Sequence, residues 1–243
     1  MSITLPTVRI LNLSVHNVNM ESALSAIDSF IQAGGAHHVV TADASMFVMA
    51  NEDPVLHSIV SKADLITPDG VGILWAARRQ HTPLQERVSG VDIVEKLCAR
   101  SADCGYRIFF LGAGPGVAAK AAERMRERYP GAMIVGVRDG YFAESETNSI
   151  LEMIRLSEAD VVCVAMGIPR QEKWIEANRE RLEVPIFIGV GGTLDVLSGN
   201  IKRAPRWMQK MALEWLWRVL NNPRKITKVL LLPRFVTLVR RAQ

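Results

Sequence analysis

The sequence predicts an α/β fold of the Rossmann-like kind, with a mostly parallel sheet and helices on both of its faces. Short, near-continuous apolar segments of strand length recur over residues 1–200. They alternate with segments whose apolar residues have helical spacing and whose charges lie on the opposite face. Parallel strands have such a composition because helices cover both faces of their sheet. A chain of 243 residues suits one such domain with an appendage, so we expect an α/β catalytic domain over 1–200 and a basic helical appendage over 201–243.

The elements are expected in a regular order along the chain. Residues 7–18 alternate between polar and apolar, which predicts an edge strand or a hairpin, and the pattern over 20–33 predicts a helix after it. Six apolar runs then predict six strands, and charged segments with helical spacing predict helices between them. The expected strands are 37–43, 64–67, 106–112, 132–140, 160–167 and 185–191, and the expected helices are 90–102, 117–130 and 170–182.

Charge is distributed very unevenly along the chain. From Lys202 onward there are eleven Lys or Arg residues and one acidic residue, Glu214, which gives this end a net charge of +10. The rest of the chain has a net charge of −6. A mildly acidic body with a basic tail indicates that the tail meets an anionic partner, such as phosphates, nucleic acid or an anionic membrane surface.

The tail also has the pattern of interfacial helices. Pro205 can start a helix with a broad apolar surface that includes Trp207 and Trp215, and a second helix is expected after Pro223. Apolar side chains beside Lys and Arg are typical of a helix that lies in a membrane interface. The alternative is that these helices pack on the sheet and expose a basic outer face. The longest apolar run, 229–232, is too short to span a bilayer.

The amino terminus and the cysteines bear on the compartment of the protein. The first ten residues lack the basic and apolar regions of a signal peptide, so we expect a cytoplasmic protein. Cys98, Cys104 and Cys163 form no CxxC pair and have no histidine cluster beside them. This spacing argues against a disulfide scaffold or a structural zinc, and we expect all three to be buried apolar residues.

Polar and glycine-rich loops follow the predicted strands. In an open parallel sheet, ligands bind outside the carboxyl ends of the strands, so these loops are expected to cluster around a binding site. The residues concerned are Thr41 and Asp43, Asp69, Gly112 and Gly114, Asp139, Gln171, and Gly191 and Gly192.

Several of these loops also have ordinary structural interpretations. The run GAGPG at 112–116 has the spacing GxGxG, short of the dinucleotide fingerprint. No acidic residue lies where the next strand should place a ribose ligand, because Asp139 comes somewhat late. A tight turn or another phosphate contact is therefore favoured over a nicotinamide site. Thr193 could cap a helix after the last strand, and Pro169 suits the first turn of a helix.

Asp69 lies in the segment TPDG, which ends a strand and opens a helix through Leu74 and Trp75. Pro-Asp-Gly is common turn chemistry and Asp is a preferred helix cap. The position favours another role, because a carboxylate at the end of a strand, among other polar loops, can act as a general base on a bound substrate. Both interpretations remain open at the level of local sequence.

The order and spacing of these motifs resemble the WecG/TagA/CpsF family of bacterial glycosyltransferases over nearly the whole chain. The segments that carry the resemblance are VVTADASMF, LITPDGVGILWAAR, ERVSGVDIVEKL, FFLGAGPGVAAKAAERM, DGYF, VAMGIPRQEKW and GVGGTLDVLSGNIKRAPRWMQKMALEWLWRVLNNPRK. The resemblance implies transfer of N-acetylmannosamine from a UDP-sugar to N-acetylglucosamine on a polyprenyl pyrophosphate, with inversion and without a required metal or cofactor. Some relatives transfer other hexoses.

The resemblance also assigns residues and partners. It implies Asp69 as the base, with Thr41, Arg87 and Gln171 in the substrate pocket, which we expect Asp43 and the glycine loops to complete. Arg203, Arg206 and Arg218 are expected to contact phosphate, with Lys225 and Lys228 at the acceptor or the membrane. A lipid-linked acceptor places the protein peripherally on the inner face of the cell membrane, without nucleic acid. The oligomeric state is left open.

Two departures from the family pattern affect specificity. Asp43 occupies the position of the asparagine in the T-x-N motif, so a group that can donate hydrogen bonds becomes one that only accepts them. Lys225 and Lys228 occupy positions where arginine is more usual, and lysine cannot clamp a phosphate with two parallel hydrogen bonds. The donor is therefore left open between N-acetylmannosamine and another hexose. A nicotinamide-dependent oxidoreductase and a nucleic-acid-binding module are the alternatives from other classes.

Overall fold

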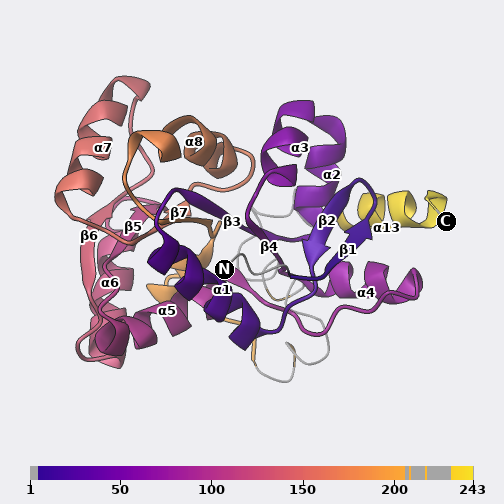
Figure 1. The fold of residues 1–243 in the computed structure, drawn as a ribbon, viewed down its shortest axis with the longest axis horizontal. Helices are drawn as coiled ribbons and strands as arrows, with labels where there is room; N and C mark the ends of the chain where they lie inside the picture. The colour runs from indigo at the N-terminus through magenta and orange to yellow at the C-terminus, as the bar shows by residue number, and fades with distance from the viewer. Residues whose placement is uncertain (1–4, 206–207, 209–216, 218–230, 243) are drawn as a thin grey trace.

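The computed structural model describes residues 5–205, 208, 217 and 231–242, and six of their strands form one sheet (Figure 1). The strand order across the sheet is β4-β3-β8-β7-β5-β6, and every neighbouring pair is parallel. All six carboxyl ends therefore lie at the same edge. The strands are β3 (His37–Ala42), β4 (Leu65–Pro68), β5 (Ile108–Gly112), β6 (Ile134–Arg138), β7 (Val161–Ala165) and β8 (Ile186–Gly189). The predicted parallel sheet is confirmed.

A hairpin precedes this sheet, as the alternating pattern predicts. Strands β1 (Thr7–Ile10) and β2 (Leu13–His16) pair antiparallel and bury every second side chain. The hairpin is joined to strand β4 by His16, whose Nδ1 accepts a hydrogen bond from the backbone N–H of Ile66 at 2.9 Å. It forms a separate two-stranded sheet beside the larger one.

Helices cover both faces of the larger sheet because successive strand residues point to opposite sides. Val39, Phe110 and Ile188 pack on one face with helices α1, α5, α6 and α9. Val40 and Phe187 face the other way, where α2, α3, α7 and α8 cover the sheet (Figure 1). The bounds are α1 (Met20–Ala33), α2 (Ala44–Glu52), α3 (Pro54–Ser61), α4 (Val71–Arg79), α5 (Gly90–Cys104), α6 (Val117–Arg128), α7 (Thr147–Leu156), α8 (Arg170–Asn178) and α9 (Thr193–Leu197), with 3₁₀ turns at Glu144–Glu146 and Arg179–Arg181.

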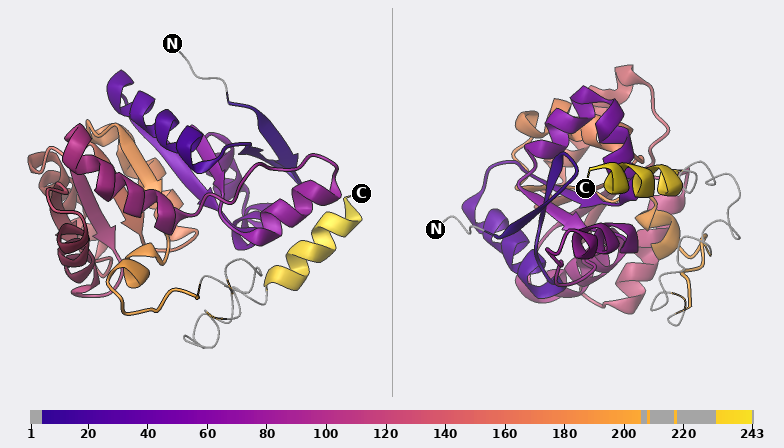
Figure 2. Two further views of the ribbon diagram at one scale, coloured as in Figure 1. Left: turned by 90° about the horizontal axis from the view of Figure 1, so that it is seen from below. Right: turned by 90° about the vertical axis from the view of Figure 1, so that its right-hand side faces the viewer.

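The last described helix, α13 (Leu231–Arg241), returns to the body and packs against α2 and α4, as Figure 2 shows for α4. Phe235 and Val239 are fully buried, and the Phe235 ring meets Phe47 of α2 edge to face at 5.9 Å between centroids. Arg234 pairs with Glu52 at 2.5 Å. Most of 206–230 lies outside the described residues, so the two predicted tail helices and the division at residue 200 stay predictions.

The cysteines follow expectation at two positions. Cys98 and Cys163 are buried, and burial raises the pKa of the Cys98 thiol to about 12. Cys104 is exposed, so the expectation that all three are buried is wrong. Cys104 is the last residue of α5, beyond the last buried turn of that helix, where Gly105 ends it in a left-handed conformation.

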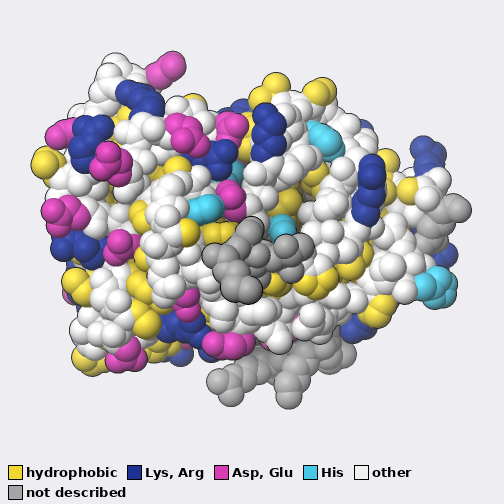
Figure 3. All heavy atoms as spheres, in the orientation of Figure 1, with side chains coloured by type: hydrophobic (Ala, Val, Ile, Leu, Met, Phe, Trp, Pro, Cys, Tyr) yellow, Lys and Arg dark blue, Asp and Glu magenta, His cyan; other side chains and the backbone are white. Residues whose placement is uncertain are grey.

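The charged side chains on the surface of the body are of both signs, as its sequence indicates. The face in Figure 3 shows acidic and basic side chains interspersed over the part of the body built by α6, α7 and α8. Among the described residues no helix is both long and apolar enough to cross a membrane.

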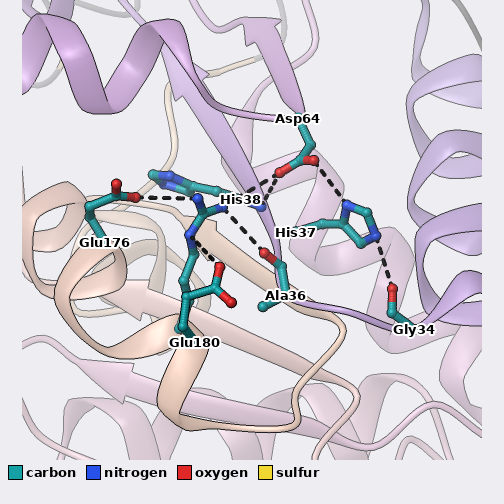
Figure 4. Close-up of polar contacts among 8 residues, drawn as sticks. Gly34, Ala36, His37, His38, Asp64, Glu176 and Glu180 are labelled. Atoms are coloured by element: carbon teal, nitrogen blue, oxygen red, sulfur yellow. Dashed lines mark hydrogen bonds and ion pairs between the residues drawn. The ribbon is translucent and has the colours of Figure 1, made fainter.

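A buried histidine lies at the amino edge of the sheet (Figure 4). His38 is 1% exposed, and neither of its ring nitrogens has a hydrogen-bond partner among the residues that the structure describes. The neighbouring His37 instead uses both of its ring nitrogens, with Asp64 and the Gly34 carbonyl, each at 3.0 Å. Burial, reinforced by the nearby positive charge of Arg179, lowers the pKa of His38 to about 3. His38 is therefore neutral in the folded protein at physiological pH.

The depressed pKa of His38 should make the free energy of unfolding depend on pH. Below pH 6.5, the ordinary value, the unfolded chain binds a proton at His38 that the folded chain does not bind until about pH 3. His38 should therefore cost about 2 kcal/mol of stability as the pH falls from 7 to 5. His38→Leu should remove this part of the pH dependence, measured by urea unfolding at both pH values.

The matched control is His81→Asn, because His81 is exposed and asparagine tolerates its positive φ of 58°. This variant should keep the pH dependence of the wild type. An unchanged pH dependence in His38→Leu would contradict the neutral, buried state of His38.

Candidate functional site

The site is built at the carboxyl edge of the sheet from Asp69 outward. The Asp69 backbone N–H donates to the Ala42 carbonyl at 2.9 Å, which fixes the turn after β4 against the end of β3. Gly70 follows with a φ of 145°, a conformation that side chains disfavour. Gly70 is the N-cap of α4 and makes no side-chain cap hydrogen bond. Asp69 is therefore not the N-cap residue of its own helix.

The Asp69 carboxylate reaches a different helix. Its Oδ2 accepts a hydrogen bond from the backbone N–H of Gly90, the first residue of α5, at 3.1 Å. Its Oδ1 lies 3.7 Å from Nη2 of Arg87, and the Asp69 side chain is 22% exposed. A helix amino terminus favours negative charge, so the amide and the arginine both stabilise the ionised carboxylate. Asp69 is held in place and remains accessible to a ligand.

Gly90 packs closely against two threonines of the site. A side chain there would place its Cβ 3.2 Å from Oγ1 of Thr41 and 3.4 Å from Oγ1 of Thr193. Thr41, which is buried, donates its hydroxyl to the Gly189 carbonyl at 2.8 Å. Thr193 donates to the Val190 carbonyl at 2.7 Å, so the interpretation of Thr193 as a cap of α9 is wrong. These contacts bring the ends of β3 and β8 to the amino terminus of α5.

Asp43 lies beside the Asp69 turn. Its carboxylate caps α2 by accepting from the Met46 N–H at 3.1 Å and from the Ser45 hydroxyl at 2.5 Å. A side chain at Gly70 would place its Cβ 3.7 Å from Cβ of Asp43, so the two loops are in contact. Asp and Asn are equally good helix caps, which explains how aspartate can occupy this position without loss of local structure.

Gln171 ties two loops together. It is 2% exposed, and its Oε1 accepts from the N–H groups of Gly167 at 3.1 Å and Gly191 at 2.9 Å. Its Nε2 donates to Glu172 at 3.1 Å, and Glu172 is fully buried. Gln171 thus fixes the loop after β7 to the loop after β8. Its expected contact with substrate stays a prediction.

The glycine loop after β5 lies further along the edge. Gly112 has a φ of 125°, and a Cβ there would lie 2.5 Å from the backbone of Ala165. Ala113 donates to the Ala165 carbonyl at 2.8 Å and accepts from the Gly140 N–H at 2.9 Å. Gly112 is thus required by strand packing. Because β8 and β7 separate β5 from β3, the loop that contains Gly112 and Gly114 forms a second group, apart from Asp69.

Of the predicted phosphate contacts in the tail, the structure describes Arg203. Its Nη2 lies 2.7 Å from Oδ1 and 2.8 Å from Oδ2 of Asp92, in the first turn of α5. The other four, Arg206, Arg218, Lys225 and Lys228, lie outside the described residues.

Sequence reasoning gave no role to three residues at this site: Ser89, Gly90 and Asp92. Ser89 caps α5, and its hydroxyl also donates to Asp92. The pattern Ser-x-x-Asp before an apolar helix is a helix-start signal that could have revealed Ser89 and Asp92. Nothing local could have revealed the Gly90 contact, because Asp69 is 21 positions away.

Comparison with known proteins decides the family. A model described as "Glycosyl transferase WecG/TagA/CpsF family" matches residues 8–243. The chain belongs to the WecG/TagA/CpsF family. A curated relative from Bacillus spizizenii, named N-acetylglucosaminyldiphosphoundecaprenol N-acetyl-beta-D-mannosaminyltransferase, is 36% identical over 201 residues, which cover 83% of this chain and 77% of the relative. The predicted resemblance is confirmed, and this WecG/TagA/CpsF protein is a glycosyltransferase of the hexosyl-transferring kind.

The contacts of Gln171 predict a large effect of its removal. Gln171→Met should lower the free energy of unfolding by about 2 kcal/mol, because it leaves two partly buried backbone N–H groups without their acceptor. Urea unfolding measures the change. Lys173→Met, on the exposed side of the same helix, is the control and should stay close to wild type. Equal stability of Gln171→Met and wild type would contradict the inference that the hydrogen bonds of Gln171 hold the loops after β7 and β8 together.

Proposed function

We propose that the protein is an inverting glycosyltransferase that moves N-acetylmannosamine from a UDP-sugar to N-acetylglucosamine on a polyprenyl pyrophosphate. The observation that carries the proposal is the Asp69 carboxylate, fixed by the Gly90 amide beside Arg87 at the strand ends. The name of the Bacillus relative supports this acceptor and this donor sugar. A place in cell-surface polysaccharide synthesis follows from a lipid-linked acceptor of this kind.

The reaction is a single displacement at the anomeric carbon. Asp69 takes the proton of the acceptor hydroxyl while that oxygen forms the new glycosidic bond. The bond between the anomeric carbon and the UDP oxygen breaks, and attack from the opposite side inverts the configuration. One positioned base is sufficient for such a step, and the Gly90 amide keeps Asp69 in a fixed orientation for it.

The departing UDP needs positive charge or oriented amides. The sequence has no D-x-D motif of the kind that holds a divalent cation in many glycosyltransferases. We therefore assign stabilisation of the leaving group to Arg87, to the amides of the strand-end loops and to the basic tail. Transfer should accordingly persist in the presence of EDTA.

A membrane-bound acceptor also accounts for the tail. Its charge of +10 and its tryptophans suit an anionic membrane surface, and we place the protein peripherally on the inner face. Phosphates of the acceptor lie at that surface, within reach of basic side chains.

Another UDP-hexose is the second candidate donor. Asp43 supports it, because a carboxylate beside Asp69 cannot donate a hydrogen bond to the sugar as an asparagine amide can. Membership of the family favours sugar transfer over the nicotinamide-dependent and nucleic-acid-binding alternatives. Incubation with a panel of UDP-sugars and lipid-linked N-acetylglucosamine, followed by mass analysis of the product, identifies the donor and the acceptor.

Asp69→Asn should abolish transfer while preserving the fold. Asparagine still accepts the Gly90 N–H but cannot take a proton, so kcat should fall by at least about 100-fold while the circular dichroism spectrum stays that of the folded protein. Asp103→Asn, exposed on α5, is the control and should keep full activity. Near-normal turnover by the folded Asp69→Asn variant would remove Asp69 from the mechanism.

Neutralising the tail should weaken membrane binding. Each basic residue near an anionic surface contributes about 1 kcal/mol, so a quadruple glutamine variant should bind phosphatidylglycerol vesicles at least about 100-fold more weakly in co-sedimentation. The substituted residues are Arg206, Arg218, Lys225 and Lys228. The control neutralises four exposed lysines of the body, Lys62, Lys96, Lys120 and Lys173. An equal loss in both variants would show that net charge, and not the tail, controls binding.

A further inference from the structure

Two carboxylates lie at the amino terminus of α5. One is that of Asp69, bound by the Gly90 N–H, and the other is that of Asp92. Asp92, in the first turn, accepts the Ser89 hydroxyl at 2.5 Å, and its own N–H lies 3.3 Å from the same hydroxyl oxygen. Ser89 is 1% exposed, so this pair is anchored in the body. The orientation of the Asp92 carboxylate is therefore set before any partner binds it.

Arg203 meets that carboxylate from the far end of the sequence. One guanidinium nitrogen spans both oxygens, at 2.7 and 2.8 Å, across 111 positions of chain. Arg203 and Asp92 are 27% and 33% exposed, so neither is fully solvated. The next residue, Ala204, is buried, which holds the chain against the body at this point.

The contact lies where the basic tail begins. On the tail side of it, the indole N–H of Trp217 donates to the carbonyl of Lys202 at 2.8 Å. On the body side, Asp92 is two positions from Gly90, whose amide holds Asp69. The first turn of α5 thus binds both the carboxylate proposed as the base, through Gly90, and the start of the tail, through Asp92.

We propose that Asp92 and Arg203 are a positioning pair that sets the C-terminal segment relative to Asp69 and so aligns the lipid-linked acceptor. This inference rests on the proposed transfer reaction. It gives Arg203 a different role from the phosphate contact that the sequence predicts, because the guanidinium acts through Asp92 and not on the substrate. We assign the tail to the departing UDP and not to the bound donor, so loss of the pair should leave KM for the UDP-sugar unchanged.

The kinetic test is a double-mutant cycle with Arg203→Gln, Asp92→Asn and the double variant. Each single substitution should raise KM for the lipid acceptor by about the same factor, on the order of 10-fold, and the double variant should be no worse than either. KM for the UDP-sugar should stay unchanged. A defect in Arg203→Gln with normal kinetics in Asp92→Asn, or multiplied effects in the double variant, would overturn the proposal in favour of a direct phosphate contact.

A matched control uses another ion pair of the same helix. Arg100 of α5 binds Asp28 of α1 at 2.8 Å, far from the first turn. Arg100→Gln and Asp28→Asn remove a comparable pair, and they should leave KM for the acceptor unchanged. A similar rise in acceptor KM in these variants would show a general loss of rigidity in α5 and would also overturn the proposal.

A second measurement is independent of turnover. Amide hydrogen exchange in peptides that cover 88–93 and 198–205 should become faster in both single variants. If the wild type transfers no sugar, the proposed function fails while exchange still reports the pair. Faster exchange without a change in acceptor KM would overturn the positioning role.

Discussion

The hydrogen bond from the Gly90 N–H to Asp69 fixes the carboxylate on which the proposed reaction depends. It joins the turn after β4 to the first turn of α5, and a glycine suits this point because Thr41 and Thr193 lie close against it. The parallel sheet makes the contact available, since it brings the ends of β3, β4 and β8 to one edge. The site therefore depends on a backbone amide whose position is set by close packing.

The same edge is organised as two groups. Asp69, Asp43 and Thr41 form one group over β4 and β3, and the glycine loops after β5 and β6 form the other. Gln171 stands between them and joins the loops after β7 and β8. In the proposed reaction the donor and the acceptor must both reach the reacting carbon, and an extended edge of this kind has room for two large molecules.

Sequence patterns predicted the sheet well and the contacts of the site poorly. Buried parallel strands such as β7 (Val161–Ala165) are continuous apolar runs, which local sequence reports directly. Helix α2 was missed because five of its nine residues are buried, so it lacks a clear polar face. Asp69 could be singled out by its place at a strand end, but its link to Gly90 and the link of Asp92 to Arg203 join distant segments. Such links depend on tertiary packing, which no local pattern encodes.

The docking of α13 has a consequence for how the two acidic loops are supported. Phe235 and Val239 fill the core between α2 and α4, the helices that follow Asp43 and Asp69. Loss of these two side chains would leave a cavity behind both loops, because their partners on α2 and α4 would have nothing to pack against. A segment that is distant in the sequence therefore acts as the backing of the carboxylates at the edge of the sheet.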